Sequence, residues 1–391
     1  MRSTRLLIAA AAVLTMAALP GCAPEPAPIA SPTTTTTLAT PTPTPTPTPD
    51  PLAGLTLEQR VGQLFMVGTA VDAVTPATVS AIVDRHAGSI FLHGRSGAGT
   101  DAVAAVVAQF TGLVGPDSTG GIRLWVSTDQ EGGEVQVLRG PGFDDMPYAI
   151  RQADLPDDQL RAQAATWGAQ LAAAGVDMNL APVADLVTSH DARFSNPPIG
   201  ALGRQYGYDE AAVAAKAGAF AAGMRAAGVM PVFKHFPGLG HVTANADTVA
   251  GVVDTTVTAD GPDVSVYRPL TRAGPSVVMM STAIYQNLDP SAPAAFSPAV
   301  VALLRDRVGF DGVVMTDDVS ATAATQAWSP ADRALLALSA GVDVVLVSAD
   351  PGVFPEMYDA VLARAQTDPA FAARVDEAAR RVVEAKDVRV G

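Results

Sequence analysis

Short apolar runs alternate with alanine-rich stretches along most of this chain, and this alternation constrains the fold more than any other feature. The runs are continuously apolar rather than alternating in polarity, which favours parallel strands buried on both faces of a sheet. Eight such runs occur, at 64–68, 89–92, 124–128, 178–183, 230–234, 277–281, 312–316 and 342–347.

The alanine-rich stretches predict helices at 157–174, 210–227, 298–308 and 330–340. A glycine directly follows each of them, as is typical of the residue that ends a helix. Eight strand–helix units in roughly 340 residues predict an α/β protein with one (β/α)8 TIM-type barrel. A doubly wound sheet is the alternative. The last segment, 371–388, has the pattern of an amphipathic closing helix, so we expect no second domain.

The first residues have the pattern of an export signal. Arg2 and Arg5 precede an apolar run at 6–19 that is too short to span a bilayer comfortably. The run closes on Leu-Pro-Gly-Cys at 19–22, which resembles a bacterial lipobox, although an ordinary cleavage site near a chance cysteine is the alternative. We therefore predict a lipoprotein signal peptide at 1–21 and a lipid-bearing Cys22 on the outer face of the cell membrane.

The segment at 22–52 is rich in proline and threonine, including a Pro-Thr alternation. Such a segment favours extended polyproline II and cannot pack a core, so we predict a spacer between the membrane and a domain at 53–391. Cys22 is the single cysteine, which excludes a disulfide within the chain. The net charge of −14 and the lack of a basic cluster argue against nucleic-acid binding.

Polar side chains appear where the apolar runs stop. The third run is followed by 129–133, the fourth by Asp185, the fifth ends in Lys234 and His235, and the seventh is followed by 317–318. A barrel would bring these positions together, because sites form at the C-terminal ends of its strands. Carboxylates, a lysine and a histidine at one rim suit an enzyme that acts on a polar substrate.

Five segments at these strand ends form a series in a fixed order. They are DQEGG at 129–133, NLAPVAD at 179–185, NPPIG with RQYG at 196–200 and 204–207, KHFPG at 234–238, and VMTDD at 314–318. In this order they resemble glycoside hydrolase family 3, specifically its single-domain bacterial β-N-acetylglucosaminidase branch. The resemblance covers residues 55–346 and implies a (β/α)8 catalytic domain.

The resemblance also implies roles for individual residues. Asp317 corresponds to the nucleophile that forms a covalent glycosyl-enzyme. The residues that correspond to those holding the sugar hydroxyls are Asp129, Arg204, Lys234 and His235. Asp318 directly follows Asp317, and we interpret it as structural. No cofactor and no metal is implied.

The loop after KHFPG departs from the family pattern. Relatives typically continue H-G-D-T-x-x-D-S-H, with the last Asp and His forming the acid/base dyad, but this chain has Asn245 and Asp247 at those positions. Asp247 is the first candidate for the proton donor, although its pKa would have to rise by ~2 units. His241 is the second, because imidazole needs little tuning. In a third interpretation the donor is lost and the protein binds glycans without cleaving them well.

These observations together predict a retaining glycosidase that releases non-reducing-end β-N-acetylglucosamine from peptidoglycan-type fragments. We expect a monomer whose partners are the glycan and, through Cys22, the membrane. An anionic Asp247 repels phosphate, so we expect hydrolysis rather than phosphorolysis. The alternatives are a β-glucosidase or β-xylosidase of the same family and a catalytically impaired glycan-binding lipoprotein.

Overall fold

A computed structural model describes residues 50–388, which contain a barrel of eight parallel strands. Their order around the sheet is β12-β9-β7-β6-β3-β2-β1-β13, and a bridge between Met315 and Val344 joins the two ends. The predicted (β/α)8 barrel is therefore confirmed. The strands are β1 (Phe65–Ala70), β2 (Ser89–His93), β3 (Trp125–Thr128), β6 (Met178–Asn179), β7 (Met230–Phe236), β9 (Val277–Met280), β12 (Val314–Thr316) and β13 (Val345–Val347).

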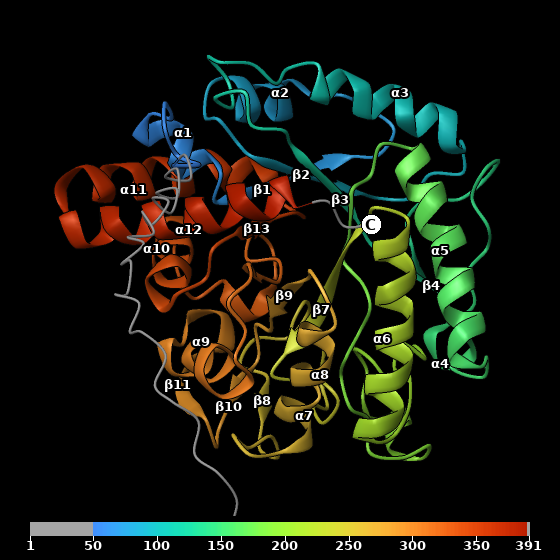
Figure 1. The fold of residues 1–391 in the computed structure, drawn as a ribbon. Helices are drawn as coiled ribbons and strands as arrows, with labels where there is room; N and C mark the ends of the chain where they lie inside the picture. The colour runs from blue at the N-terminus through green and yellow to red at the C-terminus, as the bar shows by residue number, and fades with distance from the viewer. Residues whose placement is uncertain (1–49, 389–391) are drawn as a thin grey trace, which may run out of the picture. The chain divides into compact units, whose positions relative to one another are not determined.

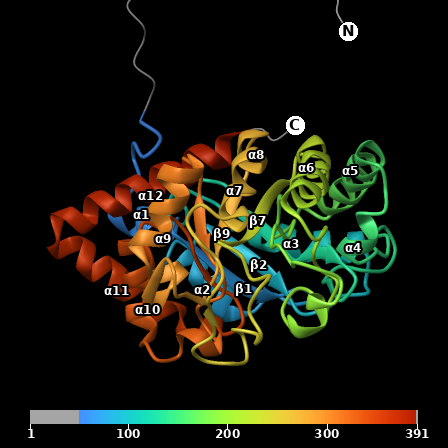
Figure 2. The ribbon, with the colours of Figure 1, turned by 90° about the horizontal axis from the view of Figure 1, so that it is seen from below.

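Helices surround the barrel, as Figures 1 and 2 show. The helices predicted at 157–174, 210–227 and 330–340 form within a residue of the expected bounds, whereas the one predicted at 298–308 divides into α9 and a π-helical segment at Leu303–Val308. Gly309 and Gly341 follow their helices with positive φ angles of 79° and 108°. The helices are α1 (Leu57–Gly62), α2 (Pro76–Val83), α3 (Thr100–Thr111), α4 (Ala149–Gln152), α5 (Asp157–Ala173), α6 (Glu210–Ala226), α7 (Pro262–Ser265), α8 (Tyr267–Arg272), α9 (Pro298–Ala302), α10 (Pro330–Ala340), α11 (Phe354–Thr367) and α12 (Pro369–Asp387).

Short additional strands form within the loops that follow the barrel strands. A hairpin after β3 consists of β4 (Gln130–Gly132) and β5 (Val135–Gln136). A three-stranded sheet combines β8 (Val253–Asp254), β10 (Ile284–Tyr285) and β11 (Asp289–Pro293). The sequence prediction did not include these pieces, because two- to five-residue strands carry too little periodicity to be recognised.

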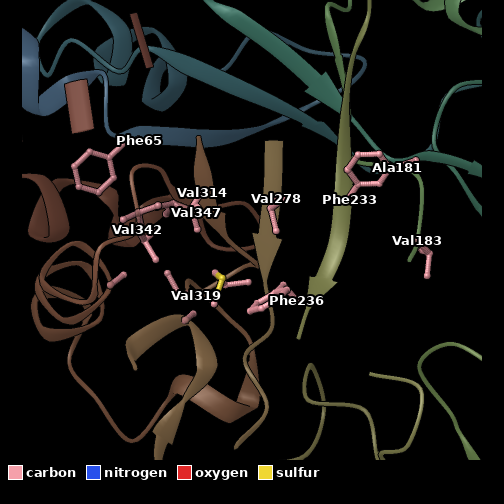
Figure 3. Packing of buried hydrophobic residues seen from close by; sticks show 14 of the residues in the cluster. Phe65, Ala181, Val183, Phe233, Phe236, Val278, Val314, Val319, Val342 and Val347 are labelled. Atoms are coloured by element: carbon pink, nitrogen blue, oxygen red, sulfur yellow. The ribbon is translucent and has the colours of Figure 1, made fainter. Parts of the chain in front are cut away.

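The strands divide the apolar core into two layers. In β1, Phe65 and Val67 face the helices while Met66 faces the barrel interior, and β2 repeats the pattern with Phe91 inside. Figure 3 shows part of the outer layer, including Phe65, Phe233 and Val314. Both faces of each strand are therefore buried, which explains why the strand sequences are continuously apolar.

The last helix, α12, closes the N-terminal end of the barrel. Its Val382 belongs to the interior cluster. Lys386 is 2% exposed and donates hydrogen bonds of 2.7 Å to Gln63 Oε1 and to the carbonyl of Gly88, which precede β1 and β2. Burial lowers the pKa of Lys386 to about 7. Within residues 50–388, no helix combines the length and the apolar character needed to cross a membrane.

Candidate active site

A pocket of about 360 Å³ opens at the C-terminal ends of the strands. Its apolar floor is the upper layer of the barrel interior, and its walls carry three aspartates and a lysine from the strand ends and one aspartate, Asp247, from a loop. Such a mixture of apolar floor and convergent polar groups is typical of a small-ligand site. The lining residues are Phe91, Asp129, Leu180, Lys234, Asp247, Met279, Asp317, Asp318, Ala321, Thr322, Leu346, Ser348 and Ala349.

One wall is a network of two cations and two carboxylates. Lys234 Nζ lies 2.7 Å from both Asp129 Oδ1 and Glu131 Oε1. Arg204 forms a two-pronged pair with Glu131, with Nε 2.8 Å from Oε2 and Nη2 2.7 Å from Oε1. The network is electrically balanced, as a buried set of charges must be. Only Asp129 and Lys234 of the four line the pocket.

Glu131 holds this wall together. Burial raises its pKa, but the charges and hydrogen bonds of Arg204 and Lys234 outweigh burial and lower that pKa to about 2. Glu131 therefore stays ionised and keeps both cations in place. The DQEGG segment contains Glu131, but the sequence prediction missed its role because its partners, Arg204 and Lys234, are distant along the chain.

His235 is oriented by a buried carboxylate. Asp185 Oδ2 lies 2.7 Å from His235 Nδ1, and Asp185 Oδ1 accepts hydrogen bonds from the backbone N–H groups of His235 and Leu239. These bonds fix the imidazole ring on its Nδ1 side and leave Nε2 for other contacts. Asp185 was noticed at a strand end in the sequence, but only the fold reveals that it positions a histidine 50 residues later.

The two consecutive aspartates after β12 have opposite environments. Asp318 accepts four hydrogen bonds, from Ser320 N and Oγ, Ser348 N and Ala321 N, which ties the loops after β12 and β13 together. Asp317 accepts one, from the N–H of Asp318. Burial raises the pKa of Asp317 to about 6, where His235 opposes the rise and Asp247 adds to it.

Asp247 reaches the same pocket from the loop that follows β7. The loop is attached to the segment after β12, because the N–H groups of Ala323 and Ala324 donate to the carbonyls of Asp247 and Ala246 at 3.1 Å. The Thr322 hydroxyl also donates to Asp247 Oδ1, at 3.4 Å. Asp247 and Asp317 therefore face one cavity from two different loops.

His241 is directed elsewhere. Its Nε2 lies 2.9 Å from Asp263 Oδ1 on α7, and His241 is not among the residues that line the pocket. The hydrogen bond to Asp263 raises the pKa of His241. In this arrangement the imidazole supports the base of the loop that carries Asp247.

Two family-like motifs explain how this loop is held. Asn196 donates its side-chain N–H groups to the carbonyls of Leu239 and Val242, at 2.7 and 2.8 Å. Gly240 passes so close to the Leu186 backbone that a Cβ would lie 1.7 Å from the Leu186 carbonyl oxygen. Only glycine fits there, which accounts for the glycine two positions after KHFPG.

The structure therefore gathers most of the predicted site residues. Asp129, Lys234, Asp247 and Asp317 line the pocket. Arg204 and His235 do not line the pocket; Glu131 holds Arg204, and Asp185 holds His235. Among the described residues, no cluster of histidine, cysteine or carboxylate side chains has the arrangement of a metal site.

A parallel (β/α)8 barrel with carboxylates facing a polar pocket at its C-terminal rim is an arrangement that glycoside hydrolases use. The family model described as "Glycosyl hydrolase family 3 N terminal domain" matches residues 56–385. The chain therefore belongs to glycosyl hydrolase family 3, and the predicted glycoside hydrolase is confirmed.

The relatives agree with this family. The chain is 35% identical over 303 residues to the β-hexosaminidase LpqI of Mycobacterium tuberculosis, a match that covers 75% of this chain and 73% of LpqI. The crystal structure of a β-N-acetylhexosaminidase from Beutenbergia cavernae is 59% identical, with a TM-score of 0.85, covering 85% of this chain and 99% of that one. A family 3 β-N-acetylglucosaminidase from Paenibacillus is 29% identical, with a TM-score of 0.76, covering 85% and 62%.

From the raised pKa of Asp317 we predict how the free energy of unfolding depends on pH. The folded state disfavours the ionised carboxylate, so the penalty is present above about pH 6 and disappears below the unfolded pKa of 3.8. Asp317→Asn should therefore raise the free energy of unfolding by about 2–3 kcal/mol at pH 7.5 and leave it nearly unchanged at pH 3.5. Urea unfolding at both pH values measures this difference.

Asp318→Asn is the matched control. It removes a carboxylate oxygen from a side chain that accepts four hydrogen bonds, so it should lower the free energy of unfolding at pH 7.5 by about 1–3 kcal/mol. A destabilised Asp317→Asn at pH 7.5 would contradict the proposed penalty.

Proposed function

We propose that this protein is a retaining β-N-acetylglucosaminidase that removes a non-reducing-end sugar from glycan fragments. The observation that carries the proposal is the pair Asp317 and Asp247, which line one pocket together with Asp129 and Lys234. Retaining and inverting glycosidases both use two carboxylates on either side of a sugar, and the retaining route is the one consistent with glycosyl hydrolase family 3. The named activities of the relatives in Mycobacterium, Beutenbergia and Paenibacillus support the choice of sugar.

In the first step, a carboxylate oxygen of Asp317 attacks the anomeric carbon of the bound sugar. The bond to the leaving oxygen breaks as its electron pair takes a proton from the Asp247 carboxyl group. In the second step, the Asp247 carboxylate removes a proton from water, and that water displaces Asp317. The sugar leaves with its original anomeric configuration, and both aspartates return to their starting protonation states.

The environment of Asp317 suits a nucleophile. With a pKa of about 6 it is mostly ionised at neutral pH, yet it accepts only one hydrogen bond that would have to be weakened during attack. Asp318 accepts four hydrogen bonds and is unsuited to attack. Asp317, which accepts one hydrogen bond, is therefore the candidate nucleophile, and Asp318, which accepts four, fixes the loops after β12 and β13.

The wall that contains Asp129 and Lys234 supplies contacts for the sugar hydroxyls. Lys234 donates charge-assisted hydrogen bonds and Asp129 accepts them, so adjacent hydroxyls of one pyranose ring can be held in a single orientation. Arg204 and Glu131 keep the Lys234 ammonium from moving. The preorganised wall means that little reorganisation is needed when the transition state forms.

The test of this function is the initial rate on an aryl β-N-acetylglucosaminide beside the matching β-glucoside and β-xyloside. We expect turnover of the acetamido sugar and a loss of at least about a thousandfold in kcat for Asp317→Asn, which removes the nucleophile. Faster turnover of the glucoside or xyloside would favour the alternative specificity. Tight sugar binding without turnover of any glycoside would favour the glycan-binding lipoprotein.

The proton donor is tested by changing the leaving group. Asp247→Asn should slow cleavage of an N-acetylglucosamine disaccharide by about 10²–10⁴, because a sugar leaving group needs an acid, and azide should restore part of the rate on the aryl substrate by replacing water. His241→Ala is the matched variant on the same loop and should change both rates much less. The reverse pattern would make His241 the donor.

The anionic Asp247 also favours water over phosphate as the acceptor.

We further propose that the protein is an exported monomer, held at the outer face of the cell membrane by a lipid on Cys22. The support is the Leu-Pro-Gly-Cys segment, which lies outside the described residues, and the proline- and threonine-rich sequence at 22–52, of which only residues 50–52 are described. This place in the cell envelope favours peptidoglycan-type fragments as the substrate.

Cys22→Ala tests the anchor. The variant should move from the membrane fraction to the soluble fraction of cells, while its rate on the aryl substrate is unchanged, because the lipid contributes nothing to the pocket. Immunoblots of fractionated cells measure the distribution. Equal membrane retention of both forms would contradict lipid attachment at Cys22.

A further inference from the structure

A second cavity, of about 610 Å³, lies on the same rim and shares no lining residue with the catalytic pocket. It is formed by the turn between β4 and β5, by helix α4 with the residues on either side of it, and by the loops that precede α6. Nothing in the glycosidase mechanism uses it. The lining residues are Glu134, Tyr148, Ile150, Arg151, Asp154, His190, Arg193, Ala201, Leu202, Gly203 and Tyr208.

Aromatic side chains that keep some solvent exposure lie at or beside this cavity. Of the six tyrosines in the chain, the four at 206, 267, 285 and 358 are buried, and the two that are not, Tyr148 and Tyr208, both line it. Phe194, which is 62% exposed, packs edge-on against His190 at a centroid distance of 5.5 Å. Tyr148 and the partly buried Tyr208 thus form the aromatic part of the lining, and Phe194 lies beside it against His190. Aromatic area that remains accessible at a cavity is a candidate binding surface.

Arg193 gives the cavity its chemical character. Its guanidinium lies 4.7 Å from the centroid of the Phe194 ring, and its Nε is buried with no hydrogen-bond partner among the described residues. The ion pairs around the cavity join Arg151 to Asp154 and His190 to Asp191, and neither includes Arg193. Arg193 is therefore a cation of the cavity lining that has no carboxylate partner among the described residues and is available to pair with an anionic group of a ligand.

We infer that this cavity binds a saccharide that carries a carboxylate. The flat C–H faces of a sugar ring can pack on Tyr148, Tyr208 and Phe194, while the guanidinium of Arg193 pairs with the carboxylate. Glu134 and Asp154 supply acceptors for hydroxyl groups. This ligand deepens the proposed function, on which it rests for the choice of sugar, because it gives the enzyme a second hold on an acidic glycan.

The position of the cavity separates it from the catalytic chemistry. Gly203 lines it directly before Arg204, and Glu134 lies three residues after Glu131, but neither member of the Arg204–Glu131 pair lines this cavity, and the two cavities share no lining residue. A ligand in this cavity therefore lies outside the pocket that contains Asp317. Its loss should change the affinity for acidic glycans without changing the rate on a small aryl glycoside.

The experiment is a calorimetric titration with N-acetylmuramic acid and with N-acetylglucosamine, which differ in a lactyl group bearing the carboxylate. Arg193→Gln should weaken the binding of N-acetylmuramic acid about tenfold or more and leave that of N-acetylglucosamine unchanged. Phe194→Ala, an exposed truncation, should weaken the binding of N-acetylmuramic acid severalfold. Arg161→Gln, at an exposed arginine of α5, is the matched control and should have no effect.

Each outcome decides the proposal. Equal affinity of Arg193→Gln and the unaltered protein for N-acetylmuramic acid, or no binding by the unaltered protein, would overturn it. The aryl β-N-acetylglucosaminide rate of Arg193→Gln should equal that of the unaltered protein. If the unaltered protein turns over no aryl glycoside, the proposed function fails, while the titration still reports on this cavity.

Discussion

The placement of Lys234 inside the barrel rim is the constraint on which the active-site architecture depends. An ammonium group that is almost fully buried needs neutralisation at short range, and Asp129 and Glu131 provide it from the segment after β3. Glu131 is in turn shared with Arg204, which fixes the loop before α6. One buried cation thus ties β7, the β3 hairpin and a distant loop into a rigid wall, against which a sugar can be oriented.

The same rim shows how one fold gives two identical side chains different tasks. Asp317 and Asp318 are neighbours, but Asp318 accepts four hydrogen bonds from two loops, whereas Asp317 accepts only one. The donors around Asp318 stabilise the loops, and the scarcity of donors at Asp317 costs stability but leaves a reactive carboxylate. Stability and reactivity are therefore divided between adjacent residues, rather than compromised within one.

The barrel could be predicted from the sequence because eight continuously apolar runs and the glycines after the helices are local signals. The pocket-facing residues Asp129, Lys234 and Asp317 were also recognisable, since each stands where an apolar run ends. Glu131 and Asp185 were not assigned, because their roles lie in pairs with Arg204 and His235, which are distant in sequence. The aromatic cavity around Arg193 carried no motif at all, and only the folded loops bring its rings together.

Helix α12 packs Val382 and Lys386 against the N-terminal end of the barrel, where Lys386 hydrogen-bonds beside the first two strands. The earliest strands of the chain thus acquire their final partners from its last helix. During synthesis, the interior of the barrel remains open at that end until this helix has been made. Under the export proposed above, this order keeps the chain incompletely folded, and so able to pass through a translocation channel, until synthesis is nearly finished.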